Sequence, residues 1–363
     1  MAFDHPVDAL PPGYRLKDYE VLRVLGRGGF GITYQARTPG ASGDLFAIKE
    51  LFPHGIAHRN RDYTVTAEHS GDHLENIVDM FIREKEVICG IHHPNIVGGR
   101  EAFELNNTAY LVMRYVTGRN LRQSLRDRGG FRPDRRTMPP FVALLLDAIG
   151  TLHGHNILHC DIKTDNIFLG INFDPVLIDL GSARIHIPGR GAEIAQTWSA
   201  NYSPIEMTHD HIGSLGPWSD IYQAAAVFYR CMAGGLPTGA DERLHAASTG
   251  LEDPFMPLAE IPEVLSQFDP AMVSAVDRGL ALFPKDRPQT VDAWRRTMPG
   301  LPQVDRRRHP IVNPGTPKPI DKPVSPTPRP VDAPAQAQTS AGEVIGWMIG
   351  IVVIITMISR CTG

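Results

Sequence analysis

The chain has 363 residues, enough for one large domain or two modest ones. Hydrophobic residues make up 42% of it, so it can bury a substantial core, and its formal charge of −4 argues against a general nucleic-acid binder. The four cysteines are far apart in the sequence and form no metal-type pair, which favours free thiols in a reducing compartment. A secretory signal is not expected, because no basic segment followed by an apolar run lies near the start.

A glycine-rich turn lies between two segments with strand-like alternation, residues 19–25 and 32–36. Its G-x-G-x-x-G pattern is weak by itself, because ordinary turns and dinucleotide-binding domains also contain it. A β-branched run rather than a helix follows the last glycine, and this favours a strand–loop–strand unit whose backbone N–H groups can approach phosphates. The candidate phosphate-binding residues are Gly26, Arg27, Gly28, Gly29, Phe30 and Gly31.

A single lysine interrupts the next apolar strand, Leu-Phe-Ala-Ile-Lys-Glu at residues 45–50. Lys49 is either a solvent-facing residue of an edge strand or the ammonium that binds the α- and β-phosphates of a nucleotide. Only one strand and one turn separate it from the glycine-rich turn, and this spacing favours the second interpretation. Residues 52–74 are polar and contain several histidines without a cysteine partner, so they predict a solvated loop rather than a metal site.

A helix is predicted from about residue 75 to 91, because its apolar residues recur at mostly helical spacing. Two of its carboxylates, Glu84 and Glu86, are two positions apart and therefore lie on different faces. The helix ends at His-Pro-Asn-Ile-Val, residues 93–97, since Pro94 cannot continue it.

Two strands are predicted near residues 101–105 and 109–114, and the second leads into Leu-Val-Met-Arg-Tyr-Val-Thr-Gly at 111–118. The chain becomes helical from Leu121, and residues 141–153 are apolar enough for a mostly buried helix. A β-rich first part is thus followed by a helical second part.

The most informative stretch is His-Cys-Asp-Ile-Lys-Thr-Asp-Asn at residues 159–166, with Asp179 thirteen positions later. Apolar runs flank both segments, which predicts a catalytic loop, a short hairpin with residues 174–175 in its turn, and a second loop for metal ligands. Phosphoryl transfer needs such an array, because one carboxylate must orient the attacking hydroxyl while an amide and another carboxylate hold Mg²⁺ against the phosphates.

These segments, in this order, resemble those of a bacterial-type (eukaryotic-like) serine/threonine protein kinase. Residues 159–166 are similar to the motif H-R-D-L-x-x-x-N, and residues 179–181 to D-F-G. The resemblance covers about residues 15–298. It implies an α+β, two-lobed fold, with a small β-rich lobe over about 15–116, a larger helical lobe over about 117–298, and ATP in the cleft between them.

The resemblance assigns a role to each residue of the site. It implies that Asp161 positions the substrate hydroxyl and accepts its proton, and that Lys163 steadies the transferred phosphoryl group. Asn166 and Asp179 would hold Mg²⁺, which Mn²⁺ could replace. A second implied set binds the nucleotide beside the glycine-rich turn: Thr33, Ala47, Lys49 paired with Glu84, the gatekeeper Met113, the hinge residues Arg114, Tyr115 and Val116, and Phe168.

Further landmarks lie beyond the catalytic segments. Residues 204–206 resemble the motif A-P-E, and the resemblance implies that Arg287 pairs with Glu206. It also implies that Ser199 contacts the catalytic-loop lysine and that Asp220 supports the backbone of that loop.

Two residues depart from the family pattern. Cys160 replaces the arginine of H-R-D, and a thiol cannot supply the bidentate bonds with which that arginine binds a phosphorylated activation segment. Activity is therefore expected to depend little on such phosphorylation. Leu180 replaces the phenylalanine of D-F-G and conserves volume and polarity, so little effect is expected.

The C-terminal part has a different composition. Residues 299–342 are proline-rich and polar, which predicts a disordered linker. Residues 343–360 contain a nearly continuous apolar run, which is either a buried core helix or, as its position after a linker favours, a transmembrane anchor. Gly346 and Gly350 could pack two such helices into a homodimer, or they are merely two glycines in an apolar run.

The expected function is Mg²⁺-dependent transfer of the ATP γ-phosphate to Ser/Thr hydroxyls of protein substrates. The kinase domain is expected to be cytoplasmic, on a single-pass anchor in the bacterial inner or plasma membrane. The alternatives are a pseudokinase that binds nucleotide as a scaffold, and a small-molecule kinase of related fold. Nucleic acid is not an expected partner.

Overall fold

The computed structural model describes residues 8–39, 43–68, 74–127, 129–170, 173–180, 183–185, 199, 201–209 and 212–304. The proposed anchor at residues 343–360, with Gly346 and Gly350, and all of the predicted linker after residue 304 lie outside the described residues. Within the described part, no helix is both long and apolar enough to cross a membrane.

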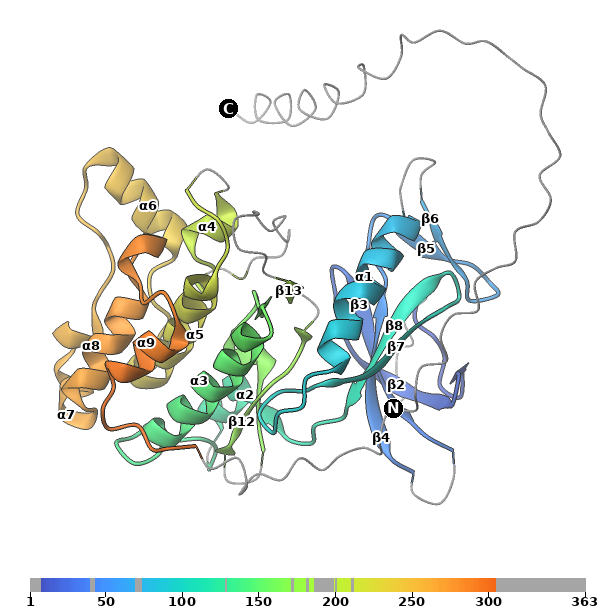
Figure 1. The fold of residues 1–363 in the computed structure, drawn as a ribbon, viewed down its shortest axis with the longest axis horizontal. Coiled ribbons are helices and arrows are strands. Elements are labelled where there is room, and N and C mark those ends of the chain that lie inside the picture. Colours follow the sequence, from blue (N-terminus) through green and yellow to red (C-terminus); the bar gives the residue numbers. More distant parts are fainter. Residues whose placement is uncertain are drawn as a thin grey trace, which may run out of the picture. The chain divides into compact units, whose positions relative to one another are not determined.

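The N-terminal lobe is built on a sheet. Among the described residues, six strands form this antiparallel sheet in the order β1–β2–β3–β4–β8–β7, and α1 packs on it (Figure 1). The elements are β1 (Arg15–Leu16), β2 (Tyr19–Gly28), β3 (Gly31–Arg37), β4 (Leu45–Leu51), α1 (Leu74–Cys89), β7 (Gly99–Leu105) and β8 (Thr108–Arg114). The predicted helix and the strands on either side of it are thus present, with ends shifted by a few residues.

The alternation of β4 explains how one strand serves both the core and the site. Phe46 and Ile48 are buried, while the residues that alternate with them, Ala47 and Lys49, point to the opposite face. In the sheet register, Lys49 is opposite Thr33 on β3, and Ala47 is opposite Met113 on β8. The predicted nucleotide residues of three strands therefore come together on one face of the sheet.

The prediction of a solvated loop at residues 52–74 is wrong for much of this segment. Strands β5 (Ala57–Arg59) and β6 (Val65–Ala67) form an antiparallel hairpin, and both Ala57 and Val65 are buried. The Arg59 guanidinium lies 2.6 Å from Glu50 on β4, and both side chains are almost fully buried. Polar residues of this segment therefore serve as internal partners, a role that composition alone does not reveal.

The C-terminal lobe is mainly helical around α5 (Pro217–Ala233), which is buried on nearly all sides. The helices around it are α2 (Leu121–Arg126), α3 (Met138–Gly154), α4 (Ile205–Thr208), α6 (Ala240–Thr249), α7 (Pro262–Gln267), α8 (Pro270–Gly279) and α9 (Val291–Arg296). The described residues of this part of the chain also form two small sheets. Their strands are β9 (Arg119–Asn120), β10 (Ile157–Leu158), β11 (Ile167–Leu169), β12 (Pro175–Leu177) and β13 (Arg184–Ile185). Strands β11 and β12 pair antiparallel, as the predicted hairpin requires.

Candidate active site

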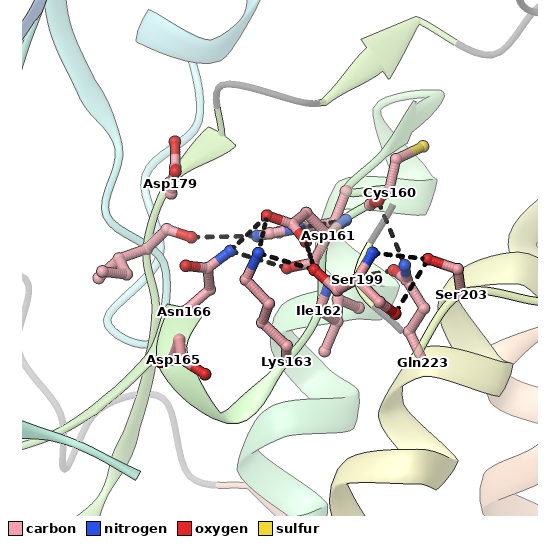
Figure 2. Close-up of polar contacts among 12 residues, drawn as sticks. Cys160, Asp161, Ile162, Lys163, Asp165, Asn166, Asp179, Ser199, Ser203 and Gln223 are labelled. Atoms are coloured by element: carbon pink, nitrogen blue, oxygen red, sulfur yellow. Dashed lines mark hydrogen bonds and ion pairs between the residues drawn. The ribbon is translucent and has the colours of Figure 1, made fainter. Parts of the chain in front are cut away.

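Four of the predicted residues meet at the catalytic loop, between β10 and β11 (Figure 2). The Asp161 carboxylate accepts hydrogen bonds of 2.8 Å from both Lys163 Nζ and Asn166 Nδ2, and a longer one of 3.3 Å from Ser199 Oγ. Lys163 Nζ also donates to Ser199 Oγ at 2.9 Å. A carboxylate, an ammonium and a hydroxyl are thus held in one partly buried cluster, as transfer to a hydroxyl acceptor requires.

Two side chains of helix α5 hold the backbone of this loop through hydrogen bonds. Asp220, which is fully buried, accepts hydrogen bonds from the N–H groups of His159 at 2.8 Å and Cys160 at 2.9 Å. Gln223 accepts from the N–H of Ile162 at 2.9 Å and donates to the carbonyl of Cys160 at 3.2 Å. These bonds maintain Cys160 at φ 61°, a left-handed conformation that side-chain-bearing residues rarely adopt.

Gln223 is a functional residue that the sequence interpretation missed. The signal was present, because Gln223 is a polar residue within an otherwise apolar, buried turn of α5. A buried amide must find partners, and Gln223 finds them in backbone groups of the catalytic loop.

Protonation of Asp220 is opposed by its neighbours. Burial by itself would raise the pKa of this carboxyl group, but hydrogen bonds from His153 at 2.8 Å and from the His159 N–H hold its pKa below the usual value. A lowered pKa in the folded state stabilises the fold above the unfolded-state pKa of about 3.9, and this stabilisation is lost as the pH falls further. The support of the loop is therefore intact at neutral pH.

Asp179 lies beside Asn166 and opposite Lys49. The N–H of Ile178 donates to the Asn166 carbonyl at 2.9 Å, which places Asp179 next to the catalytic loop. The Lys49 ammonium forms an ion pair with the Asp179 carboxylate. Asn166 directs its amide nitrogen to Asp161. Its amide oxygen and the carboxylate oxygens of Asp179 are hard donors of the kind that Mg²⁺ prefers.

The predicted contact between Lys49 and Glu84 is not formed among the described residues. Glu84 instead lies 3.5 Å from the ammonium of Lys85, which is fully buried and donates at 3.0 Å to the carbonyl of Leu180. Adjacent helical residues are about 100° apart, so α1 cannot direct both side chains at the site in one orientation. In this structure α1 presents Lys85, and Lys49 pairs with Asp179 instead.

A cavity of about 380 Å³ lies between the sheet and the catalytic segments. Its lining contains eleven of the predicted residues: Gly26, Thr33, Ala47, Lys49, Met113, Arg114, Tyr115, Val116, Asn166, Phe168 and Asp179. It also contains residues that the sequence interpretation missed: Leu25, Val97, Asn120, Gln123 and Ile178. The apolar ones gave no signal, because a core residue and a cavity-lining residue look alike in sequence. Glu84, Asp161 and Lys163 do not line this cavity.

The glycine-rich turn has two kinds of glycine. A Cβ at Gly31 would come within 2.2 Å of the Glu50 carbonyl oxygen, so β3 and β4 require glycine there to pack. A Cβ at Gly26, Gly28 or Gly29 would meet nothing within 4 Å, so the fold itself does not demand glycine at these positions. Gly26 lines the cavity, whereas Arg27, Gly28, Gly29, Phe30 and Gly31 do not. The open space that the glycines leave fits a loop that closely approaches phosphates.

Alanine substitutions are expected to separate these two roles. Gly28→Ala should leave the melting temperature near that of the wild type and weaken nucleotide binding, whereas Gly31→Ala should lower the melting temperature because two strands must move apart. Thermal unfolding and titration with a fluorescent ATP analogue measure both effects. If Gly28→Ala destabilised the fold as much as Gly31→Ala does, the assignment would be wrong.

One further landmark, the pairing of Arg287 with Glu206, is formed as the resemblance predicts. Arg287 makes two hydrogen bonds of 2.7 Å and 3.1 Å to Glu206, and both side chains are fully buried. Cys160 is also buried, in a small apolar cluster with Leu158, Met207 and Leu215. The position that an arginine occupies in the family motif is here part of the packing beneath the loop.

Comparison with known proteins agrees with this geometry. Residues 19–297 match the protein kinase domain family. The chain is similar to the serine/threonine-protein kinase PknD of Mycobacterium tuberculosis, at 29% identity over 289 residues that cover 77% of this chain and 39% of the relative. It is similar to PknH of the same organism, at 26% identity over 326 residues that cover 85% and 47%. The chain spans about half or less of the length of the curated relatives it matches.

Solved structures give the same result. The apo form of PpkA-294 has a TM-score of 0.65 at 29% identity, and the match covers 80% of this chain and 99% of that one. The kinase domain of M. tuberculosis PknI has a TM-score of 0.56 at 23% identity, covering 80% and 100%, and supports the fold alone. With more than half of its length matched to the family and its catalytic segments in the corresponding order, the chain belongs to the protein kinase family.

Proposed function

We propose that this protein transfers the γ-phosphate of ATP to Ser/Thr hydroxyls of protein substrates, with Mg²⁺ as the metal. The convergence of Asp161, Lys163, Asn166 and Ser199 beside the cavity that Lys49 and Asp179 line carries the proposal. The relatives named above are serine/threonine-protein kinases, which supports this choice of acceptor.

Each residue contributes a distinct step. Asp161 orients the acceptor hydroxyl and takes its proton, and Lys163, 2.8 Å away, neutralises charge on the group in transfer. Lys49 holds the α- and β-phosphates. Asn166 and Asp179 would hold Mg²⁺, and the metal would supply positive charge to neutralise the phosphate oxygens. Helix α5 keeps these groups in place through the loop backbone.

The test compares wild type with Asp179→Asn. Phosphate transfer from ³²P-labelled ATP to a generic basic protein is measured at several Mg²⁺ concentrations, followed by phosphoamino-acid analysis. Removing a metal-binding carboxylate should lower transfer by at least about 10²-fold, as for other residues that stabilise transition-state charge, while ATP binding persists. A ³²P signal that is equally low in the two proteins would instead favour the pseudokinase.

A small-molecule kinase is the other alternative. Ser199 and the anchored residues 204–206 favour a protein substrate, because they lie where a polypeptide acceptor would dock beside Lys163. Labelling of protein acceptors in the same assay distinguishes the two.

We further propose that the apolar run at residues 343–360 anchors the chain in the bacterial inner or plasma membrane, with the kinase domain in the cytoplasm. The absence of charge between residues 344 and 359 supports it. The full chain should remain in the membrane pellet after carbonate extraction, and a chain ending at residue 342 should be soluble. Recovery of the full chain in the supernatant would rule out the anchor.

Activity should also be largely independent of activation-segment phosphorylation, because Cys160 packs against Met207 and cannot bind a phosphate as arginine does. Thr197→Ala and Ser182→Ala, at positions outside the described residues, should retain most of the wild-type activity. This prediction would be contradicted if either variant lost its activity and the wild type were active only when phosphorylated at the same site.

A further inference from the structure

The segment between β4 and α1 contains a hairpin to which the proposed chemistry assigns no task. After β4, this hairpin segment (residues 52–68) passes through a tight turn and forms β5 and β6. It is also bonded to the far edge of the sheet, since the N–H of Val65 donates at 2.8 Å to the carbonyl of Asn106, between β7 and β8. The hairpin segment is therefore a fixed part of the N-terminal lobe.

The start of the hairpin segment is bonded to the tip of the glycine-rich turn. Strands β2 and β3 pair as far as a last pair of glycines, so Gly29 and Phe30 are the two residues at the tip. The N–H of Phe52 donates to the carbonyl of Phe30 at 3.0 Å, and the N–H of His54 donates to the carbonyl of Gly29 at 3.0 Å. Both tip carbonyls are thus held by residues that follow β4, although the tip itself is exposed.

These bonds influence how the tip can meet a phosphate. A trans peptide group is planar, and its C=O and N–H point in opposite directions. Because the carbonyl of Gly29 is turned toward the hairpin segment, the N–H of Phe30 in the same peptide group is turned away from it. Backbone N–H groups are the donors with which such a turn binds an anion. Holding the carbonyl therefore determines the side on which the tip offers its donor.

A buried network centred on Glu50 supports the hairpin segment. The Glu50 carboxylate is fully buried and accepts hydrogen bonds of 2.6 Å, 2.7 Å and 2.6 Å from Arg59, Tyr34 and Tyr110. Arg59 belongs to β5, and its guanidinium also lies over the ring of Phe52, 5.1 Å from the ring centre. A fully satisfied buried network is rigid. Arg59 therefore fixes Phe52, which is one of the two residues bonded to the tip.

The bond from His54 depends on the tight turn at residues 53–56. The N–H of Ile56 donates to the carbonyl of Pro53 at 3.2 Å, and Gly55 has a φ of 80°. A bond between the first and fourth residues, with a positive φ at the third, is typical of a type II turn, whose second residue has a φ near −60°. The backbone of this turn therefore sets the direction of the His54 N–H.

We propose that the hairpin segment is a positioning element of the nucleotide site, which holds the tip of the glycine-rich turn in the orientation that binds the phosphates of ATP. Phe52 and His54 act through the tip, and Glu50 and Arg59 hold the hairpin segment in place. This inference rests on the proposed kinase function and adds the residues that position its phosphate-binding turn. Loss of the contact should weaken the binding of ATP but not of adenosine, because adenosine carries no phosphate.

The experiment removes one backbone donor from the full chain. His54→Pro lacks the N–H, and proline is favoured at the second position of a type II turn, so the turn itself should persist. ATP and adenosine are titrated separately as competitors of a bound fluorescent ATP analogue. His54→Pro should weaken ATP binding by about 2–10-fold, the usual effect of one hydrogen bond, with the Kd for adenosine unchanged. In steady-state transfer, the KM for ATP should rise while the KM for the protein acceptor stays the same.

Two further variants separate positioning from general stability. His54→Ala is the matched control, because it removes the exposed imidazole and keeps the N–H, and it should bind ATP as the wild type does. Arg59→Met removes the support of Phe52, and it should lower both the melting temperature and the affinity for ATP, with adenosine binding retained below that temperature. If Arg59→Met does not fold, as thermal unfolding would show, the two variants at residue 54 still decide the outcome.

Three results would overturn the proposal. They are unchanged ATP affinity in His54→Pro, an equal loss for ATP and adenosine, and an equal loss in His54→Ala. Failure of the proposed function has a different signature, since a protein that shows the selective loss of ATP affinity but transfers no phosphate would contradict the transfer alone.

Discussion

Replacing Asp161 with asparagine is expected to lower kcat by about 10²–10⁴-fold, the usual contribution of a positioned general base. An amide can occupy the same space between Lys163 and Asn166, but it cannot take the proton of the acceptor hydroxyl. The KM for ATP should change little, because Asp161 does not line the nucleotide cavity. Steady-state transfer to a protein acceptor, with ATP and acceptor varied separately, measures both quantities.

Asp165→Asn is the matched control for this experiment. Asp165 belongs to the same loop, but it is partly exposed, pairs with Arg122 and is turned away from the cluster around Asp161 (Figure 2). Its substitution should leave kcat near the wild-type value. Equal losses in the two variants would point to general damage of the loop, and no loss in Asp161→Asn would exclude this carboxylate as the base.

Replacing Arg287 with methionine is expected to destabilise the protein by about 3–5 kcal/mol, the cost of removing one partner from a buried ion pair. Glu206 would then keep only the Ser219 hydroxyl, and the carbonyls of Ala281 and Leu282 would each lose a donor. Chemical denaturation at neutral pH measures the free energy of unfolding. Methionine keeps most of the side-chain volume, so the loss should report the polar contacts rather than a cavity.

An exposed pair on the other lobe provides the comparison. Arg37 on β3 contacts Glu20 at 3.0 Å, but the two side chains are 49% and 27% exposed. Arg37→Met should cost no more than about 1 kcal/mol, since water screens such a pair. If the two substitutions had similar effects, the buried pair would not stabilise the fold in the way its geometry suggests.

Several elements could be read from the sequence because their signals are local. The alternation around Lys49 and the apolar periodicity of α1 depend only on neighbouring residues, and the structure shows both elements. The hairpin of residues 57–67 could not be read in this way. In this hairpin Arg59 forms a buried ion pair with Glu50 of another strand. From composition alone, these two residues look like two separate charges in solvent.

The orientation of α1 is a second case in which sequence was insufficient. Glu84 is the residue that the family pattern assigns to Lys49, yet α1 directs Lys85 to the Leu180 carbonyl and Lys49 pairs with Asp179. A helical pattern defines which residues share a face, but the packing of the whole helix decides which face is turned inward.

The sequence by itself determined the family and the order of the catalytic segments, and it predicted the reacting groups, because these depend on residue type and spacing along the chain. Only the tertiary structure decided which side chains touch: Gln223 with the backbone of the catalytic loop, and Lys49 with Asp179. The physical reason is that hydrogen bonds and ion pairs act over about 3–4 Å in space, and separation along the chain does not constrain that distance.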